Sequence, residues 1–376
     1  MTNQTTVMEF LLLGFSDSRE LQILHFMIFL LIYLATLIGN MLIIVALLVD
    51  PNLHTPMHFF LGNLSFIDLC YISVTTPKSM VNAITNIRSI SFYGCITQLF
   101  LVICFMSAEL AFLTVMAYDR YIAICQPLRY RLIMSNSTCL QLTVVCWIGS
   151  VIYSAFLTGD TFRLHFCGSN IISHFFCDIP QLLKLSCTDT HANEIMLFVC
   201  CSVFGSIFIA SIFVSYIHIF ITVLKMPSVR GKYKTLSTCL PHLTVFSLFM
   251  STTMLTYMRP SLVHSDYHSL IDAVLYSVVP PLINPIIYSL RNKEIKNVDA
   301  FSYRGMSLMH MPTAQHQELF ATMKGNPCLF ILLLLEEMFL RENSAKWKDN
   351  VSYSRTLESC VFKVIIQVTE HLQRTQ

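Results

Sequence analysis

The chain has 376 residues, of which 55% are hydrophobic and 12% are charged, with a formal net charge of +2. Soluble domains carry about 25% charged residues, so this composition excludes an ordinary water-soluble protein and is typical of a membrane protein. The small net charge gives no indication of nucleic-acid binding, and nucleic acid is not an expected partner.

Seven stretches with little or no charge follow one another along the chain. Each meets or approaches the roughly 20 residues that a helix needs to cross a hydrocarbon core about 30 Å thick. Because backbone polar groups must be satisfied inside the membrane, we expect helices, and the alternating pattern of a membrane barrel is absent. The predicted spans are residues 24–49, 57–76, 93–118, 139–158, 195–224, 235–258 and 273–290.

The distribution of basic residues predicts the orientation of this all-α membrane bundle. An odd number of spans places the termini on opposite faces, and the positive-inside rule makes the more basic connections cytoplasmic. We therefore expect an extracellular N-terminus (1–23), a seven-helix domain (24–297) and a poorly ordered cytoplasmic tail (298–376). The basic residues are Arg120, Arg129, Arg131, Lys225, Arg230, Lys232, Lys234, Arg291, Lys293 and Lys296.

The N-terminal segment has its own signals. Asn3-Gln4-Thr5 is an N-glycosylation acceptor on the side predicted to be extracellular. The first 22 residues lack a basic start and a small-residue cleavage site, so no removable signal peptide is expected and the first span directs insertion.

Cysteines on the predicted outer side indicate disulfides, which persist in that oxidising space. Four such cysteines allow three pairings, and spacing alone does not choose between them. The segment HFFCD, which begins at His174, also suggests a metal site, but one histidine and one thiol fall short of the usual ligand set. A loop disulfide is the preferred interpretation, and no metal is expected. The four cysteines, out of 14, are Cys95, Cys167, Cys177 and Cys187.

Polar side chains inside the predicted spans form a second candidate feature. Asp68 lies midway along the second span and Glu109 deep in the third. An ionisable residue at bilayer depth costs roughly 2.5–3.5 kcal/mol on insertion scales and is by default a functional hypothesis. With Asn40 and Asn284 they are predicted to form an intramembrane cluster. Such a cluster either holds water or a cation, or serves as interhelical hydrogen bonds.

The last span contains three prolines, Pro280, Pro281 and Pro285. Each removes a helix hydrogen bond, so a kink is expected near Asn284, either as a moving part or as a static bend.

The sequence carries no zinc-protease helix, glycine-rich phosphate loop or nucleophile elbow. Neither an enzyme nor a cofactor is predicted. A transporter or channel would need a continuous polar path, and only the Asp68 and Glu109 cluster offers one. The remaining interpretation is a signal transducer.

Two short motifs mark the ends of spans three and seven. Asp119-Arg120-Tyr121 is similar to the Asp-Arg-Tyr motif of rhodopsin-like (class A) G-protein-coupled receptors, and Asn284-Pro285-Ile286-Ile287-Tyr288 to their Asn-Pro-x-x-Tyr motif. Longer segments resemble olfactory receptors, and the resemblance covers residues 1–297. These segments are LHTPMHFFLGNLSFIDLC from Leu53, MAYDRYIAICQPLRY from Met116, KTLSTCLPHL from Lys234 and PPLINPIIYSLRNKEI from Pro280.

The resemblance implies a plasma-membrane receptor that binds small, mostly apolar odorants and activates a stimulatory olfactory-type heterotrimeric G protein, raising cAMP. It implies the pairs Cys95–Cys177 and Cys167–Cys187, which pin an outer loop over the ligand. Asp119 would hold Arg120 at rest. The implied switch residues are Asp119, Arg120, Tyr121, Tyr216, His242, Asn284, Pro285 and Tyr288.

A ligand cavity is expected among spans three, five, six and seven, towards the outer side. An apolar lining with a few hydroxyls suits a small volatile molecule held by dispersion and one or two hydrogen bonds. The expected lining residues are Val102, Ile103, Met106, Ser107, Cys200, Phe204, Thr253 and Tyr257.

Three departures separate this chain from the family pattern. Met250 stands where many members have a tyrosine thought to take part in switching, and Pro241 is expected to bend the sixth span. After Asn297 the short basic tail of the family is replaced by about 80 unrelated residues. Two alternatives therefore stay open: a receptor of the same fold for a metabolite outside the nose, and a variant inactivated by its tail.

Overall fold

The computed structural model describes residues 9–12, 18–85, 87–166, 170–187, 190–258 and 266–291. The predicted glycosylation site Asn3 and the predicted tail lie outside them. Short elements join the long helices: η1 (Pro51–Leu53), η2 (Pro127–Arg129), α4 (Tyr130–Ile133) and α6 (Ile179–Leu183). The long helices are α1 (Arg19–Val49), α2 (Pro56–Thr85), α3 (Phe92–Cys125), α5 (Asn136–Thr161), α7 (His191–Lys225), α8 (Val229–Met258) and α9 (Asp266–Arg291).

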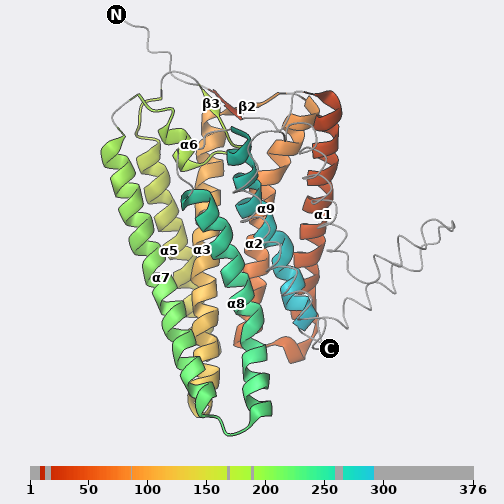
Figure 1. Cartoon of the computed structure of the whole chain (residues 1–376), viewed down its shortest axis with the longest axis vertical. Coiled ribbons are helices and arrows are strands. Elements are labelled where there is room, and N and C mark those ends of the chain that lie inside the picture. Colours follow the sequence, from red (N-terminus) through yellow and green to blue (C-terminus); the bar gives the residue numbers. More distant parts are fainter. Residues whose placement is uncertain are drawn as a thin grey trace, which may run out of the picture. The chain divides into compact units, whose positions relative to one another are not determined.

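The long helices coincide with the seven predicted spans and lie alongside one another as a bundle (Figure 1). Within the described ranges, α1, α2, α3, α5 and α7 are long and apolar enough to cross a membrane. Serine side chains define where two of the helices begin. Ser91 Oγ accepts from Gly94 N at 3.1 Å before α3, and Ser135 Oγ accepts from Thr138 N at 3.3 Å before α5.

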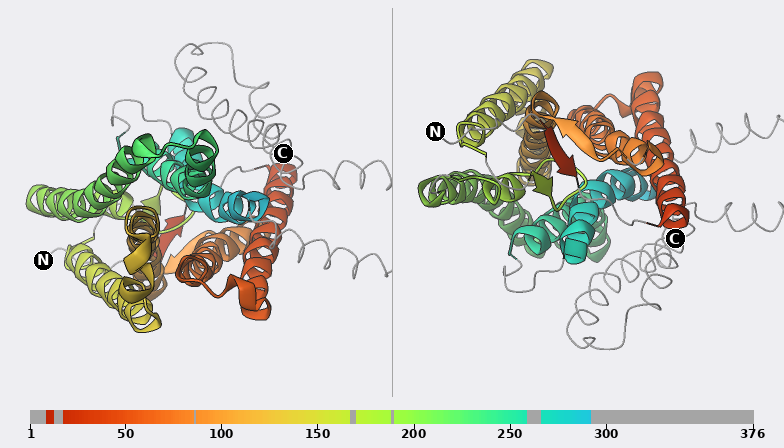
Figure 2. Two further views of the ribbon diagram at one scale, coloured as in Figure 1. Left: turned by 90° about the horizontal axis from the view of Figure 1, so that it is seen from below. Right: turned by 90° about the horizontal axis from the view of Figure 1, so that it is seen from above.

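Helix α3 lies at the centre of the bundle, as the end-on views show (Figure 2). In its most apolar window 67% of the residues are buried, against 6% in α7. Helix α3 therefore packs on protein, whereas most apolar side chains of α7 face outward, where a membrane supplies lipid. The largest core cluster surrounds α3 and includes Phe60, Leu64, Phe112, Leu113, Met116, Val245, Phe249 and Ile287.

A three-stranded sheet covers one end of the bundle, which we call the sheet end. Its strands are β1 (Glu9–Leu12), β2 (Ser89–Ser91) and β3 (Ile171–Ile172), in the order β2-β1-β3. Strand β1 pairs antiparallel with β2 and parallel with β3. The N-terminal strand therefore lies between two loops that are far apart in the sequence.

Helices α1 and α9 meet where a proline leaves a carbonyl without a helix donor. Pro285 has no N–H, so it cannot bond the carbonyl of Pro281 one turn earlier. Asn40 Nδ2 donates to that carbonyl at 3.0 Å. The approach is close because a Cβ on Gly39 would lie 3.2 Å from Pro285 Cβ. Asn40 thus compensates for the helix hydrogen bond that Pro285 removes.

We expect Asn40→Ala to lower the stability of the purified protein by about 1–3 kcal/mol, because the buried Pro281 carbonyl loses this donor. The thermal midpoint in detergent measures the effect. Leu34→Ala is the matched control, since Leu34 lies on the same helix and is 43% exposed. Equal midpoints for the two variants would contradict the role of Asn40.

Candidate functional site

Three of the predicted intramembrane polar residues meet between α2, α3 and α9. Asn284 Nδ2 donates to Asp68 Oδ2 at 3.1 Å and lies 3.4 Å from Glu109 Oε1. All three side chains are buried. Two carboxyl groups therefore share one amide donor, an arrangement that favours interhelical bonding. Asn40 reaches α9 separately, through the Pro281 carbonyl. In the described part of the chain, no group of three or more His, Cys, Asp and Glu side chains could hold a metal ion.

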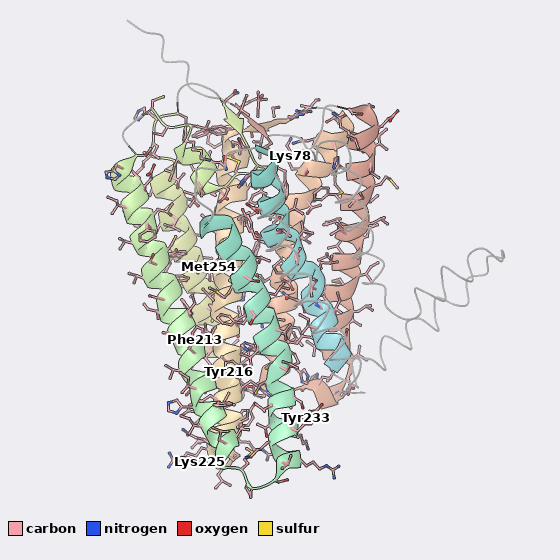
Figure 3. The ribbon with its side chains drawn as sticks, in the orientation of Figure 1. Lys78, Phe213, Tyr216, Lys225, Tyr233 and Met254 are labelled. Atoms are coloured by element: carbon pink, nitrogen blue, oxygen red, sulfur yellow. A yellow bond between two sulfur atoms is a disulfide. The ribbon has the colours of Figure 1, made fainter. Side chains whose placement is uncertain are left out.

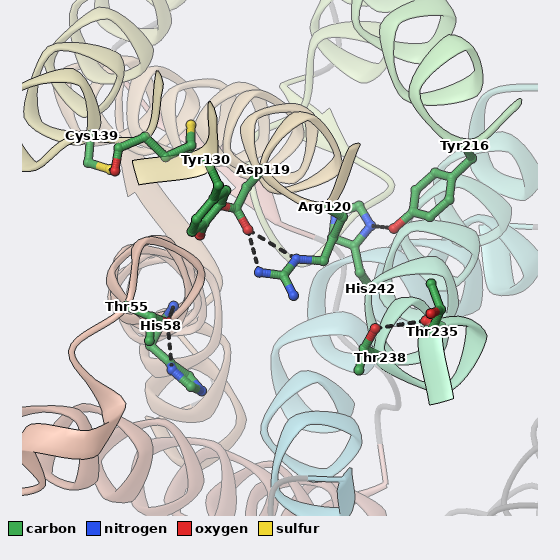
Figure 4. Close-up of polar contacts among 11 residues, drawn as sticks. Thr55, His58, Asp119, Arg120, Tyr130, Cys139, Tyr216, Thr235, Thr238 and His242 are labelled. Atoms are coloured by element: carbon green, nitrogen blue, oxygen red, sulfur yellow. Dashed lines mark hydrogen bonds and ion pairs between the residues drawn. The ribbon is translucent and has the colours of Figure 1, made fainter. Parts of the chain in front are cut away.

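Asp119 and Arg120 form an ion pair at the end of α3 opposite the sheet, which we call the Arg120 end (Figure 4). Arg120 Nε donates to Asp119 Oδ2 at 3.0 Å, and Tyr130 Oη donates to Asp119 Oδ1 at 2.8 Å. Burial and the neighbouring Asp119 carboxylate raise the pKa of Tyr130, so its hydroxyl keeps the proton that it donates. Both carboxylate oxygens are thus occupied, and Arg120 is held against its own helix.

A second polar link joins α3, α7 and α8 beside this pair. His242 Nε2 lies 2.8 Å from the Leu113 carbonyl, and His242 Nδ1 lies 2.7 Å from Tyr216 Oη. A carbonyl only accepts, so Nε2 carries the hydrogen, and in the neutral imidazole Nδ1 accepts from Tyr216. The imidazole is fully buried. Moving α8 away from α3 would break at least one of these two bonds.

The other predicted switch residues lie near this link without joining it. The Tyr121 ring lies 5.5 Å from the ring of His218, and Gln126 Nε2 donates to Tyr121 Oη at 3.4 Å. Tyr288 is buried in the core cluster around α3, and its hydroxyl has no hydrogen-bond partner among the described residues. Among the described residues, Tyr216 is bonded to His242, and neither tyrosine hydroxyl is hydrogen-bonded to Arg120.

The predicted ligand-lining residues separate into two apolar clusters. Val102 and Met106 pack in the first, which we call the loop cluster, with Tyr71, Phe175, Phe176, Ala273 and Tyr276. Ile103 and Cys200 pack in the second, which we call the strand cluster, with Phe10, Leu99, Leu157, Cys177 and Leu182 among others. Neighbouring residues of α3 therefore face different clusters, a division that helical spacing alone did not predict.

The remaining predicted lining residues have local partners. Ser107 Oγ donates to the Ile103 carbonyl at 2.8 Å, and Thr253 Oγ1 donates to the Phe249 carbonyl at 2.8 Å. The Phe204 ring stacks on Tyr153 of α5 at 4.1 Å. Tyr257 lies in α8, but its side chain is outside the described part of the chain.

The loop between α5 and α7 is bonded to the helices beneath it. A disulfide joins Cys95 to Cys177, the pairing that the resemblance implied. Gln98 Oε1 accepts from Cys177 N at 2.9 Å, and Tyr276 Oη donates to Asp178 Oδ2 at 3.0 Å. The loop is therefore tied to both α3 and α9. The sulfur of Cys177 is not a free thiolate that could bind a metal.

The second predicted disulfide is only partly described. Cys187 is disulfide-bonded. Cys167 lies outside the described residues, so its pairing stays a prediction.

Comparisons with known proteins assign the chain to a family. The sequence profile of the olfactory receptor family matches residues 29–301. The chain belongs to the olfactory receptor family. Olfactory receptor 14C36 of Homo sapiens is 51% identical over 296 residues, which cover 79% of this chain and 95% of that protein. Olfactory receptor 14A16 of Homo sapiens is 50% identical over 299 residues, which cover 79% of this chain and 96% of that protein.

The fold is also that of a known receptor structure. Squid rhodopsin matches with a TM-score of 0.59 at 16% identity, covering 81% of this chain and 91% of that one. This olfactory receptor therefore has the class A G-protein-coupled fold that the sequence predicted. It is a receptor rather than an enzyme, and a multi-pass protein of the plasma membrane.

Sequence reasoning missed three contributors to these sites. Tyr130 holds Asp119, Gln98 holds the loop, and Tyr276 binds Asp178. Each is an ordinary polar residue, and its partner is at least eleven positions away in the sequence. No local spacing rule connects such pairs.

Proposed function

We propose that this receptor binds small, mostly apolar volatile molecules and activates a stimulatory olfactory-type G protein, which raises cAMP. The observation that carries the proposal is the loop cluster. Val102 and Met106 of α3 lie among aromatic side chains beneath a loop that is tied to α3 and α9. An apolar site with few polar groups favours dispersion over ion pairing, which suits volatile ligands.

The proposed orientation puts the sheet end outside the cell and the Arg120 end in the cytoplasm. Lys225 lies at the end opposite the sheet (Figure 3), and Arg129 and Arg131 follow α3 at the Arg120 end. The positive-inside rule supports this orientation. The disulfide at the sheet end is consistent with an oxidising outer face.

In the proposed mechanism, the observed arrangement is the resting state. Ligand contacts beneath the loop favour a second state, in which α8 leaves α3 and the Asp119–Arg120 pair opens towards the G protein. Tyr216 is released from His242 and moves with Tyr288 to support Arg120. The polar cluster at Asn284 lies between the two ends and couples them. The ligand must supply the few kcal/mol between states as differential affinity.

The test is cAMP in cells that express the full chain or a version ending at Asn297. Each is challenged with a panel of aliphatic alcohols, aldehydes, esters and aromatic ketones while surface display is measured. We expect at least one compound to raise cAMP in both forms. A response only from the shortened form would make residues 298–376 inhibitory. Silence from both forms at normal surface display would overturn the proposal.

A further inference from the structure

Strand β1 shows a buried side and an exposed side within four residues. Phe10 is 0% exposed and Leu12 is 2% exposed, whereas Leu11 between them is 39% exposed. This alternation is that of a strand with one face against a core. The N-terminal segment therefore contributes core side chains to the sheet end.

The backbone of β1 connects two loops. Leu12 N donates to the Arg88 carbonyl at 2.8 Å on the β2 side, and Leu11 N donates to the Asn170 carbonyl at 2.7 Å on the β3 side. Asn170 Nδ2 also donates to the Glu9 carbonyl at 3.0 Å. Since the order is β2-β1-β3, β1 separates the two outer strands, which have two or three residues each. Such short strands need the middle strand to stay paired.

Phe10 connects this sheet to the helices. Its ring lies 6.1 Å from that of Phe92, at the start of α3, and 5.6 Å from that of Phe166, in the segment after α5. Phe10 also belongs to the strand cluster, together with Ile103 and Cys200, two of the predicted lining residues. A continuous set of apolar contacts therefore leads from the N-terminal strand to the part of the predicted ligand lining that lies in the strand cluster.

We propose that Phe10 is a positioning residue for the predicted lining residues of the strand cluster, Ile103 and Cys200: it holds the loop between α5 and α7 against α3, closing this cluster to water. The inference rests on the proposed function for its ligand readout, but closure itself is measurable without any ligand. Removing the ring leaves a cavity in a packed cluster and weakens the pairing of β1 with both loops. Local opening at the sheet end then becomes more frequent.

The first experiment measures this opening through Cys200, a partly buried free cysteine of the strand cluster. Intact cells that express the full chain are treated with a membrane-impermeant maleimide. The labelling rate of Cys200 is the labelling rate of each receptor minus the rate of the same receptor with Cys200→Ser. We expect Phe10→Ala to label Cys200 at least about fivefold faster, because local opening exposes it. Leu11→Ala, on the exposed face of the same strand, should label at the unaltered rate.

The second experiment uses a cross-link, so that it does not depend on a destabilised variant. Leu11 and Ser89 are directly opposed in the antiparallel pair. Opposed residues are close enough for a disulfide between Leu11→Cys and Ser89→Cys. A positioning strand stays in place during signalling. The cross-linked receptor should therefore give the same cAMP response as the unaltered receptor, and its Cys200 should still be labelled slowly. A cross-linked receptor that reaches the surface but loses its response would show that β1 must move, and would overturn the proposal.

The third readout is potency with any compound found active in the cAMP panel. Phe10→Ala should raise the half-maximal agonist concentration about tenfold or more at matched surface display. Phe10→Leu, which keeps apolar bulk, should have a half-maximal concentration close to that of the unaltered receptor. If the panel finds no agonist, the proposed function fails while the labelling result still decides closure. Equal labelling of Cys200 in Phe10→Ala and Leu11→Ala would overturn the inference.

Discussion

Replacing Arg120 with alanine is expected to abolish the agonist-dependent rise in cAMP. In the structure the guanidinium is bound to Asp119, and Tyr130 occupies the other carboxylate oxygen. The arginine side chain is only 19% exposed, so opening the pair must present the guanidinium to a partner. Alanine has no donor to present, and the maximal response should fall by about tenfold or more. The measurement is cAMP at saturating agonist, normalised to surface display.

The companion variant Asp119→Asn should raise cAMP in the absence of agonist. The amide keeps the shape of the carboxylate but not its charge, so the pair that holds Arg120 is weakened. A change of about 1–3 kcal/mol moves a two-state equilibrium about 5- to 150-fold towards the active state. Arg129→Ala is the matched control, because Arg129 is an exposed arginine at the same end of the bundle. Unchanged signalling in both Arg120→Ala and Asp119→Asn would show that the Asp119–Arg120 pair is not part of the switch.

The helices were predictable because a hydrocarbon core leaves the backbone no alternative to helix. The ends of the helices were less predictable, because hydropathy shows only the stretch that crosses the lipid and not the full length of the helix. Helix α1 begins at Arg19, before the predicted span, and α2 continues to Thr85 with Pro77 inside it. These two extensions bond each other, because Arg19 Nη1 donates to the Ala83 and Ile84 carbonyls at 3.3 and 2.8 Å.

The candidate sites, too, were predictable from the sequence only in part. Asn40, Asp68, Glu109 and Asn284 were expected to form one cluster because polar groups in a membrane must find one another. The structure brings the last three together, whereas Asn40 bonds the Pro281 carbonyl instead. Strand β1 could not be predicted, since four residues of Glu-Phe-Leu-Leu carry too short an alternation to indicate a strand. It forms only because two loops from elsewhere in the chain lie on either side of it.

Replacing Cys95 with alanine is expected to prevent delivery of the receptor to the cell surface. Its disulfide with Cys177 closes a loop with a sequence separation of 82 and ties the loop over the bundle to the first turn of α3. Losing a native disulfide typically costs about 2–5 kcal/mol. Here the loss also leaves Cys177 without its disulfide partner, and it weakens the contact between Cys177 N and Gln98 that holds the loop. A receptor with an open sheet end should be retained during folding.

Flow cytometry on unpermeabilised cells, compared with total protein after permeabilisation, measures this delivery. Cys201→Ala is the matched control, because Cys201 is a free, exposed cysteine on α7. That variant should reach the surface normally, while Cys95→Ala and Cys177→Ala should fail to the same extent, since each removes the same bond. Normal delivery of Cys95→Ala would mean that the apolar packing of the strand cluster, which includes Phe10, holds the loop without the covalent link.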